Sequence, residues 1–272
     1  MANKYDRTLS DHFDGHGYSD HGTLWNSCWT TAKTPWDRQQ PSAALSDLLL
    51  NKPELFEFST DKTTRTALVP GCGRGHDVLS LSAFGYDVYG LDLSARAIQE
   101  AKKNEEAWKA GGKLEAKKGL LGNRTWFAGD FFSNEWVERS GVPGGKFDLI
   151  FDYTFGCALP WEARPAWAKR IVELLAPEGR LVCLEFPTTK PPSARGPPYN
   201  FTPEAYLAHL GHPGEKIYSN DTDATVDGKW AGSPPSKDGL KRLVHIKPER
   251  THPAGMDGDV VEDWVSVWAH NA

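Results

Sequence analysis

A glycine-rich segment constrains the fold of this chain more than any other feature of its sequence. The run TALVP (Thr66 to Pro70) is short and apolar, which is typical of a buried strand, and GCGRG follows it directly. A helix is expected next, from His76 to Phe84. A buried strand, a glycine turn and a helix in this order favour a parallel sheet whose strands are joined by crossover helices.

The same alternation continues along the chain. Further strands are expected at residues 86–92, 125–130, 147–153 and 180–186. Helices are expected at residues 42–50, 95–108 (capped by Ser94), 164–175 and 203–210. Residues 240–249 and 263–270 alternate in strand fashion and predict two final strands, antiparallel to each other. The fold class is therefore α/β, a doubly wound, seven-stranded, mainly parallel sheet, whereas residues 1–23 are expected to form a loop.

Composition narrows the class of protein. The 272 residues, 39% apolar and 25% charged, fit a single domain over 1–272, with an N-terminal lid or helical segment at 1–50 and a surface excursion at 211–262. The net charge of -5 argues against a nucleic-acid partner. No stretch approaches the ~18 apolar residues that a membrane span needs, and the N-terminus has no apolar signal core. We expect a cytoplasmic monomer without a membrane partner.

The chain offers little for a metal or a disulfide framework. The four cysteines are far apart, and none belongs to a CxxC pair: Cys28, Cys72, Cys157 and Cys183. Three histidines near the N-terminus lie among Gly, Asp and Ser in the expected loop: His12, His16 and His21. A mobile polar N-terminus explains them better than a metal site, and no metal is expected.

The ends of three successive strands carry the strongest functional signal. Gly71, Gly73 and Gly75 form a G-x-G-x-G turn, which differs from the G-x-G-x-x-G of dinucleotide-binding folds. Asp92 ends the second strand, where it can accept from ribose hydroxyls. At the end of the third strand, Asp130 can accept from an adenine amino group, and Phe131 can cover the ring. Each feature alone also fits a plain turn, a helix cap or a solvated acid, but together they favour S-adenosylmethionine over a nicotinamide nucleotide.

With these motifs placed, the chain resembles the thiopurine S-methyltransferase family, and within it the plant halide/thiol methyltransferases and their fungal relatives. The resemblance runs from about Trp25 to Tyr199 and is carried by CWTTAKTPWD, LVPGCGRGHD, GLDLS, FDLIFDYTFGCALPWEARPAWAKRIVELLAPEGRL and PPY. It implies a class I S-adenosylmethionine-dependent methyltransferase fold, Rossmann-like. After residue 210 the chain is longer than the plant pattern and ends in WVSVWAHNA, as in fungal members.

The resemblance also implies roles for individual residues. The cofactor-binding set would be Trp25, Trp29, Trp36, Gly71, Gly73, Asp92, Leu93, Asp130, Phe131 and Asp152. The catalytic set would be Asp152, Tyr153 and Arg164, and the substrate set Tyr153, Phe155, Cys157 and Arg164. Plainer interpretations remain open: core packing for Phe155, Cys157 and the tryptophans, and a surface charge for Arg164. A base from the N-terminal lid, Asp20 or His21, is a weaker hypothesis.

The expected activity is methyl transfer from S-adenosylmethionine to a thiol of a small molecule, leaving S-adenosylhomocysteine. Some fungal members of the family methylate dithiols of sulfur-bridged diketopiperazines, so a gliotoxin-like epidithiodiketopiperazine dithiol is one candidate acceptor. A halide or small thiol such as bisulfide is the alternative. A nicotinamide-dependent reductase and a non-catalytic cofactor-binding regulator are the alternatives from other classes. Because a thiolate attacks a sulfonium directly, positioning supplies much of the catalysis, and a dedicated base is not required.

Overall fold

The computed structural model describes residues 7–57, 64–218, 225–230 and 232–271. The chain divides into two compact units. The N-terminal unit is Ser19–Phe151, and the C-terminal unit comprises Asp152–Ala272 together with Met1–Tyr18. Strand β4 (Phe147–Tyr153) begins in the first unit and ends in the second, so that its last two residues belong to the C-terminal unit.

The main sheet has seven strands in the order β3-β2-β1-β4-β5-β9-β6. Besides β4, its members are β1 (Arg65–Pro70), β2 (Tyr86–Asp92), β3 (Arg124–Ala128), β5 (Leu175–Glu185), β6 (Leu240–Ile246) and β9 (Trp264–His270). β1 pairs in parallel with β2 and β4, and β2 pairs in parallel with β3. β9 is antiparallel to β5 and β6. The predicted doubly wound, mainly parallel sheet is confirmed, including the antiparallel pairing of the last two long strands.

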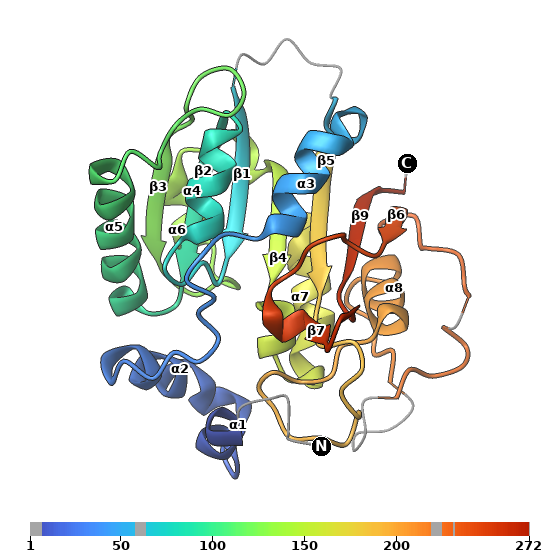
Figure 1. Cartoon of the computed structure of the whole chain (residues 1–272). Helices are drawn as coiled ribbons and strands as arrows, with labels where there is room; N and C mark the ends of the chain where they lie inside the picture. Colours follow the sequence, from blue (N-terminus) through green and yellow to red (C-terminus); the bar gives the residue numbers. More distant parts are fainter. Residues whose placement is uncertain (1–6, 58–63, 219–224, 231, 272) are drawn as a thin grey trace. The chain divides into compact units, whose positions relative to one another are not determined.

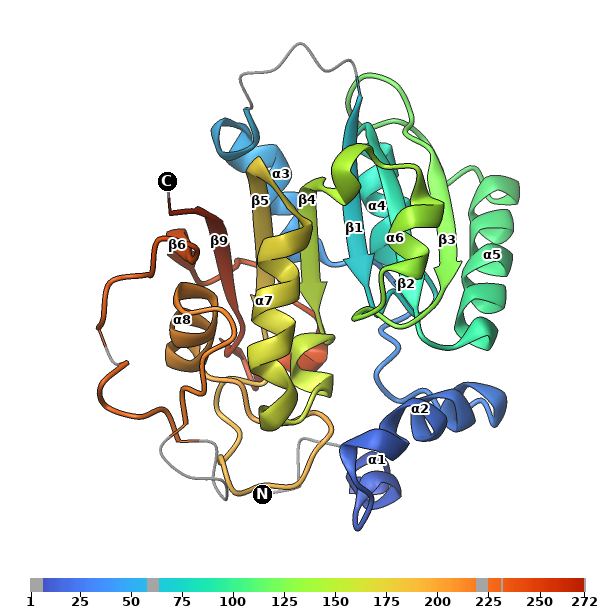
Figure 2. The ribbon, with the colours of Figure 1, turned by 180° about the vertical axis from the view of Figure 1, so that it is seen from behind.

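The N-terminal unit places helices on both faces of its strands. Its α-helices are α2 (His21–Thr30), α3 (Ala43–Asn51), α4 (His76–Ala83), α5 (Ala95–Ala110) and α6 (Glu135–Ser140). Helices α4 and α6 lie on opposite faces of β1, β2 and β3 (Figures 1 and 2). Ser94 caps α5 as predicted, since its hydroxyl accepts from the backbone N–H of Arg96 at 3.2 Å.

The C-terminal unit is built from α1 (Arg7–Phe13), α7 (Arg164–Leu174) and α8 (Pro203–Gly211) with β5, β6 and β9. Helices α7 and α8 contact each other and pack on β5 and β6 (Figure 2). α7 passes directly into β5, which starts at Leu175 rather than at the predicted Arg180. A small hairpin, β7 (Met256–Asp257) and β8 (Val260–Val261), lies in the connection between β6 and β9.

Short 3-10 helices complete the described elements. They are η1 (Tyr18–Asp20), η2 (Pro53–Phe56), η3 (Pro143–Gly145), η4 (Gly156–Ala158), η5 (Trp161–Ala163) and η6 (Pro253–Gly255). Two of them, η4 and η5, follow β4 and lead into α7, so the chain after β4 turns tightly rather than extending.

The prediction of a loop over residues 1–23 was wrong where the structure describes that segment. Residues 7–13 form α1, and α2 begins at His21. The helix exists because Leu9 and Phe13, four positions apart, share one face and are buried at 7% and 3% exposure. The surrounding Asp, His and Gly residues make the segment polar in composition, so these two apolar residues do not stand out as a helical pattern. Residues 1–6 of the predicted loop lie outside the described residues.

Trp126 on β3 fixes the spacing of the N-terminal unit. A Cβ on Gly90 would lie 2.7 Å from the Trp126 ring, and one on Gly75 would lie 2.3 Å from it. The indole Nε1 donates to Glu105 of α5 at 2.8 Å, which holds the ring in place. The close contact of Trp126 with two glycines explains why β2 carries a glycine at its centre and why the turn after β1 can approach β3.

We expect Gly90→Ala to destabilise the protein by about 1–3 kcal/mol, because the added methyl group would overpack Trp126 and Val78. Denaturant unfolding compared with the wild type measures the change. Gly228→Ala is the matched control, since a Cβ there would have no heavy atom within 4 Å. Equal stability of Gly90→Ala and the wild type would contradict the packing described above.

Candidate cofactor and acceptor sites

The glycine turn after β1 is closed against the end of β2. All three predicted glycines adopt positive φ angles: 59° at Gly71, 52° at Gly73 and 72° at Gly75. The backbone N–H of Cys72 donates to the carbonyl of Leu91 at 2.9 Å. L-residues with a side chain rarely adopt these angles, so the turn depends on glycine at these positions.

Asp92 anchors this turn through its side chain. Its Oδ2 accepts from the backbone N–H of Gly73 at 3.0 Å, and its Oδ1 accepts from the backbone N–H of Ser94 at 2.9 Å. Burial raises the pKa of Asp92 to about 6, although both bonds oppose the rise. A carboxylate has about four acceptor positions, so each oxygen keeps room for one further donor. Such a carboxylate fits two neighbouring hydroxyl groups, as a ribose presents them.

The end of β3 lies next to the end of β2. The backbone N–H of Gly129 donates to the carbonyl of Asp92 at 3.0 Å. Asp130 is exposed, and its Oδ1 accepts from the backbone N–H of Phe132 at 3.0 Å. Phe131 is buried at 5% exposure, whereas the side chain of Leu93 is 46% exposed. The structure thus places the predicted glycine, ribose and adenine residues at the ends of adjacent strands, β1, β2 and β3.

The three tryptophans form one cluster in the same unit. The Trp36 ring lies edge to face on Trp25 and Trp29, with centroids at 5.0 Å and 5.8 Å. Trp29 is only 5% exposed, and its ring would lie 3.3 Å from a Cβ on Gly73. The cluster therefore packs directly against the glycine turn, which joins two sets of predicted cofactor residues that are about forty positions apart in the sequence.

In the C-terminal unit, Asp152 holds the turn after β4. Its Oδ1 accepts from the backbone N–H of Gly156 at 3.0 Å, and its Oδ2 accepts from Nε1 of Trp167 at 2.9 Å. The side chain is 1% exposed, and burial raises its pKa to about 6. Both oxygens are thus engaged in fixing η4 and α7, so this carboxylate orients the residues that follow it.

Tyr153, the last residue of β4, packs against a residue from a distant part of the chain. Its ring stacks on His252 with centroids 5.6 Å apart and an interplanar angle of 6°, and Phe186 lies edge-on at 6.4 Å. Phe155 is half-buried, and Cys157 is buried at 2% exposure. His252 therefore brings the β6–β9 connection onto the end of β4, beside the predicted substrate residues.

Arg164 is buried at 1% exposure, so its interpretation as a surface charge was wrong. Nη1 donates to the hydroxyl of Tyr218 at 2.9 Å, Nε donates to the carbonyl of Leu159 at 3.3 Å, and the guanidinium lies 4.0 Å above the ring of Phe201. Within the described part of the chain, no carboxylate forms an ion pair with Arg164, and its buried Nη2 has no hydrogen-bond partner. A buried cation without a carboxylate is costly unless another anion compensates it.

Several residues of this region were not predicted from the sequence. Tyr218 also bonds His209, with Nε2 at 3.0 Å from the hydroxyl, and burial holds the pKa of His209 well below its usual value. His245 pairs with Glu185, buried at the carboxyl end of β5, at 3.1 Å. Tyr218 and His252 lie in the parts of 211–262 whose polar composition indicated only surface, and a single ring residue in each was the only available signal. His245 lies in the predicted strand at 240–249, but its partner Glu185 is 60 positions away, so no local pattern marks the pair.

Neither a metal site nor a membrane span emerges from the described residues. No group of three or more His, Cys, Asp or Glu side chains in the described part of the chain is arranged to hold a metal ion. In the same residues, no helix has both the length and the apolar character needed to cross a bilayer.

Comparison with known proteins places the chain in a family. Residues 21–237 match the family described as Thiopurine S-methyltransferase. The chain is 36% identical over 209 residues to Thiocyanate methyltransferase 1 of Brassica oleracea, covering 75% of this chain and 80% of that protein. It is 31% identical over 201 residues to a Thiopurine S-methyltransferase of Vibrio cholerae, covering 71% and 84%.

Solved structures agree in fold. A magnesium protoporphyrin IX methyltransferase from Synechocystis, solved with bound S-adenosylmethionine, superposes with a TM-score of 0.53 at 15% identity, covering 93% of this chain and 98% of that one. A methyltransferase from Anabaena variabilis gives a TM-score of 0.53 at 16% identity, covering 92% and 95%. At these identities the likeness concerns the fold alone. The family match and the sequence relatives show that the chain belongs to the thiopurine S-methyltransferase family and is an S-adenosylmethionine-dependent S-methyltransferase.

Proposed function

We propose that this enzyme methylates the sulfur of a small thiol that it binds as the thiolate, and that Arg164 provides the charge for that anion. The observation that carries the proposal is the buried guanidinium of Arg164, which has an unpartnered Nη2 and no carboxylate at ion-pair distance among the described residues. A thiolate or another small anion would compensate this charge. A nearby cation also lowers the pKa of a thiol, which is near ~8.5 when unperturbed, and so raises its thiolate fraction.

The cofactor roles follow from the N-terminal unit. We assign the ribose to Asp92, the adenine to Asp130 and Phe131, and the methionine part to the turn at Gly71 and Gly73, with Leu93 beside them. Trp25, Trp29 and Trp36 supply aromatic faces for a positively charged sulfonium, a contact worth ~0.5–2 kcal/mol. When bound, S-adenosylmethionine supplies an activated methyl group on that sulfonium. Asp152 serves here as a positioning residue, since both its oxygens already hold the chain after β4.

The acceptor residues follow from the C-terminal unit. We assign the binding of an apolar or planar thiol to the half-buried Phe155 and to Tyr153, which is 8% exposed and stacks on His252. Cys157, buried at 2% exposure, serves as a small apolar side chain. Aromatic surface of this kind favours a soft sulfur nucleophile over a strongly hydrated amine or hydroxyl.

Three classes of acceptor are candidates. The relatives are named for a thiopurine, which is a planar heterocyclic thiol, and for thiocyanate, which is a small sulfur anion. The resemblance to fungal members adds the dithiol of a sulfur-bridged diketopiperazine. We favour an aromatic or apolar organic thiol because Tyr153, Phe155 and His252 provide ring surface that a halide or bisulfide would not use; the inorganic anions are the second candidate, which the charge of Arg164 favours.

A screen of acceptors read by mass spectrometry tests this proposal. It contains an aromatic thiol, an alkyl thiol, a dithiol, thiocyanate, bisulfide and iodide, and it measures S-adenosylhomocysteine together with one or two methyl additions. We expect the highest kcat/KM with the aromatic or apolar thiol. Turnover of only the inorganic anions would favour the second candidate, and no S-adenosylhomocysteine with any acceptor would refute a catalytic role.

For the cofactor, we expect Asp92→Asn to weaken S-adenosylmethionine binding by about 1.5–3 kcal/mol, the scale of hydrogen bonds to a charged group. Calorimetry measures the dissociation constant. The exposed Glu106, whose side chain is 72% accessible, provides the control Glu106→Gln. An unchanged dissociation constant in Asp92→Asn would remove Asp92 from the ribose site.

The same pair of proteins should differ in pH dependence. The pKa of Asp92 is about 6, and hydroxyl donors bind its ionised form, so wild-type affinity should fall as the pH drops through about 6. Asp92→Asn cannot titrate at this position, and its affinity should change less over pH 5 to 7. Parallel curves for the two proteins would contradict the assignment.

For the acceptor, we expect Arg164→Met to lower kcat/KM for the thiol by roughly ten- to hundredfold at neutral pH, since the anion loses a charged partner. The loss should shrink as the pH rises above the thiol pKa of ~8.5, because the thiolate then forms without help. Arg164→Lys retains the positive charge, so a smaller loss in this variant than in Arg164→Met would separate the effect of the charge from an effect on folding. Lys169→Met, on the exposed face of α7, is the control. A loss independent of pH would argue against thiolate stabilisation.

A further inference from the structure

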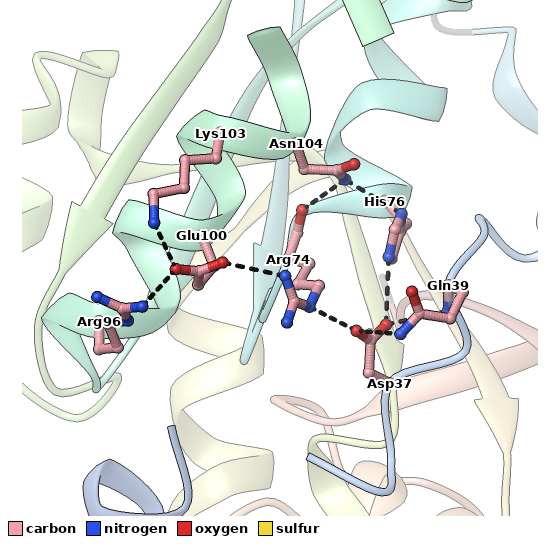
Figure 3. Close-up of polar contacts among 8 residues, drawn as sticks. All are labelled: Asp37, Gln39, Arg74, His76, Arg96, Glu100, Lys103 and Asn104. Atoms are coloured by element: carbon pink, nitrogen blue, oxygen red, sulfur yellow. Dashed lines mark hydrogen bonds and ion pairs between the residues drawn. The ribbon is translucent and has the colours of Figure 1, made fainter. Parts of the chain in front are cut away.

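Asp37 lies at the centre of a hydrogen-bond network that the proposed chemistry does not use (Figure 3). It directly follows Trp36, and its side chain is only 4% exposed. Oδ1 accepts from His76 Nε2 at 3.2 Å and from the backbone N–H of Gln39 at 3.0 Å. Oδ2 accepts from Gln39 Nε2 at 2.8 Å and forms an ion pair with Arg74, whose Nε lies 2.6 Å away.

Three hydrogen bonds and the ion pair with Arg74 therefore engage both oxygens of the carboxylate. Burial alone would raise the pKa of Asp37, but the bonds from His76 and Gln39 and the charge of Arg74 hold it below its ordinary value. The group is thus an ionised acceptor whose two oxygens are both engaged by the chain. Asp37 therefore acts on the glycine turn through Arg74 and His76, rather than on a bound molecule.

Arg74 and His76 belong to the glycine turn and the start of α4, on either side of Gly75. Both are fixed from the opposite side by Asn104 of α5, whose Nδ2 donates to the carbonyl of Arg74 at 2.9 Å and lies 3.1 Å from His76 Nδ1. Since the same amide nitrogen serves as donor to both, His76 Nδ1 is the acceptor and its Nε2 carries the proton given to Asp37. The turn is therefore held between α5 and Asp37 with a defined direction for every bond.

Trp36, the residue before Asp37, is also connected to the glycine turn, through Trp29. Trp36 contacts Trp29, and the Trp29 ring packs at Gly73. The segment that carries the tryptophans is thus attached twice to one turn, by aromatic contact at Gly73 and by ionic and hydrogen bonds at Arg74 and His76. Helix α2 also contacts α5, where Ser94 Oγ donates to Asn26 Oδ1 at 2.8 Å, and the attachment at Arg74 and His76 adds a constraint at the Trp36 end of the segment.

We propose that Asp37 is a positioning residue that seats the tryptophan cluster (Trp25, Trp29 and Trp36) on the glycine turn and thereby sets the affinity for the sulfonium cofactor. This inference rests on the proposed placement of S-adenosylmethionine at the glycine turn and the cluster. It assigns no chemical step to Asp37.

The first experiment measures S-adenosylmethionine binding to Asp37→Asn by calorimetry. Asparagine keeps the shape of the side chain but places an amide donor against Arg74 or His76, so the interaction of residue 37 with one of these two residues is lost. We expect the dissociation constant to rise about tenfold, the scale of one charged hydrogen bond, while kcat at saturating cofactor stays within about twofold. Arg74→Gln, which removes only the guanidinium, should show a smaller rise and serves if Asp37→Asn does not fold.

Lys103→Ala is the matched control within the network of Figure 3. Lys103 is 64% exposed and pairs only with the outer side of Glu100 at 2.9 Å in that network, so its loss should leave binding unchanged. Equal weakening of binding in Lys103→Ala and Asp37→Asn would mean that the net charge of the region sets the affinity, rather than the positioning of the tryptophan cluster by Asp37. This result would overturn the proposal.

A double-mutant cycle with Trp36→Ala separates positioning from stability. If Asp37 acts through the cluster, Asp37→Asn should weaken binding much less in the Trp36→Ala background than in the wild type. Additive losses would overturn the proposal, as would a lower melting temperature of Asp37→Asn with unchanged affinity. Wild-type protein that fails to bind S-adenosylmethionine would instead refute the cofactor placement itself, whereas wild-type binding with an unaffected Asp37→Asn would refute only the role of Asp37.

Discussion

The bond between the Gly73 N–H and the Asp92 carboxylate is the interaction on which the N-terminal unit depends. It ties the turn after β1 to the end of β2, and the Asp92 carbonyl continues the link to Gly129 at the end of β3. Three strand ends are thereby fixed at one edge, where ligands of doubly wound sheets bind. Because backbone groups satisfy only half of the acceptor capacity of Asp92, the same bond that builds the fold leaves a charged group available to a ligand.

The two buried charges of the C-terminal unit contrast with each other. Asp152 accepts from the backbone of Gly156 and Phe155 and from the ring of Trp167, and so it stabilises the turn into α7. Arg164, twelve positions later, is equally buried but keeps an unpartnered Nη2. Charged groups buried in proteins are usually compensated, so the difference separates a structural carboxylate from a cation suited to an anionic acceptor.

Sequence patterns predicted most elements because strands and helices are encoded locally. β2 and β4 have the predicted bounds, and Ser94 caps α5 as expected. The failures have physical causes. α1 has only Leu9 and Phe13 as its buried stripe, too few for a periodic signal, and the start of β5 at Leu175 has no loop to mark it. Tyr218 and His252 were missed because their contacts are with residues far away in the sequence.

By itself, the sequence determined the parallel strands, the glycine turn and the acid at the end of β2, since each depends on the identity of a residue and its immediate neighbours. Tertiary structure alone decided what the side chains around them do. It buried Arg164 without a carboxylate, stacked His252 on Tyr153 and joined the carboxylate of Asp37 to Arg74 and His76 on either side of Gly75. Burial and hydrogen-bond partners arise from contacts between distant segments, and these decide whether a charged residue binds a ligand or holds the chain.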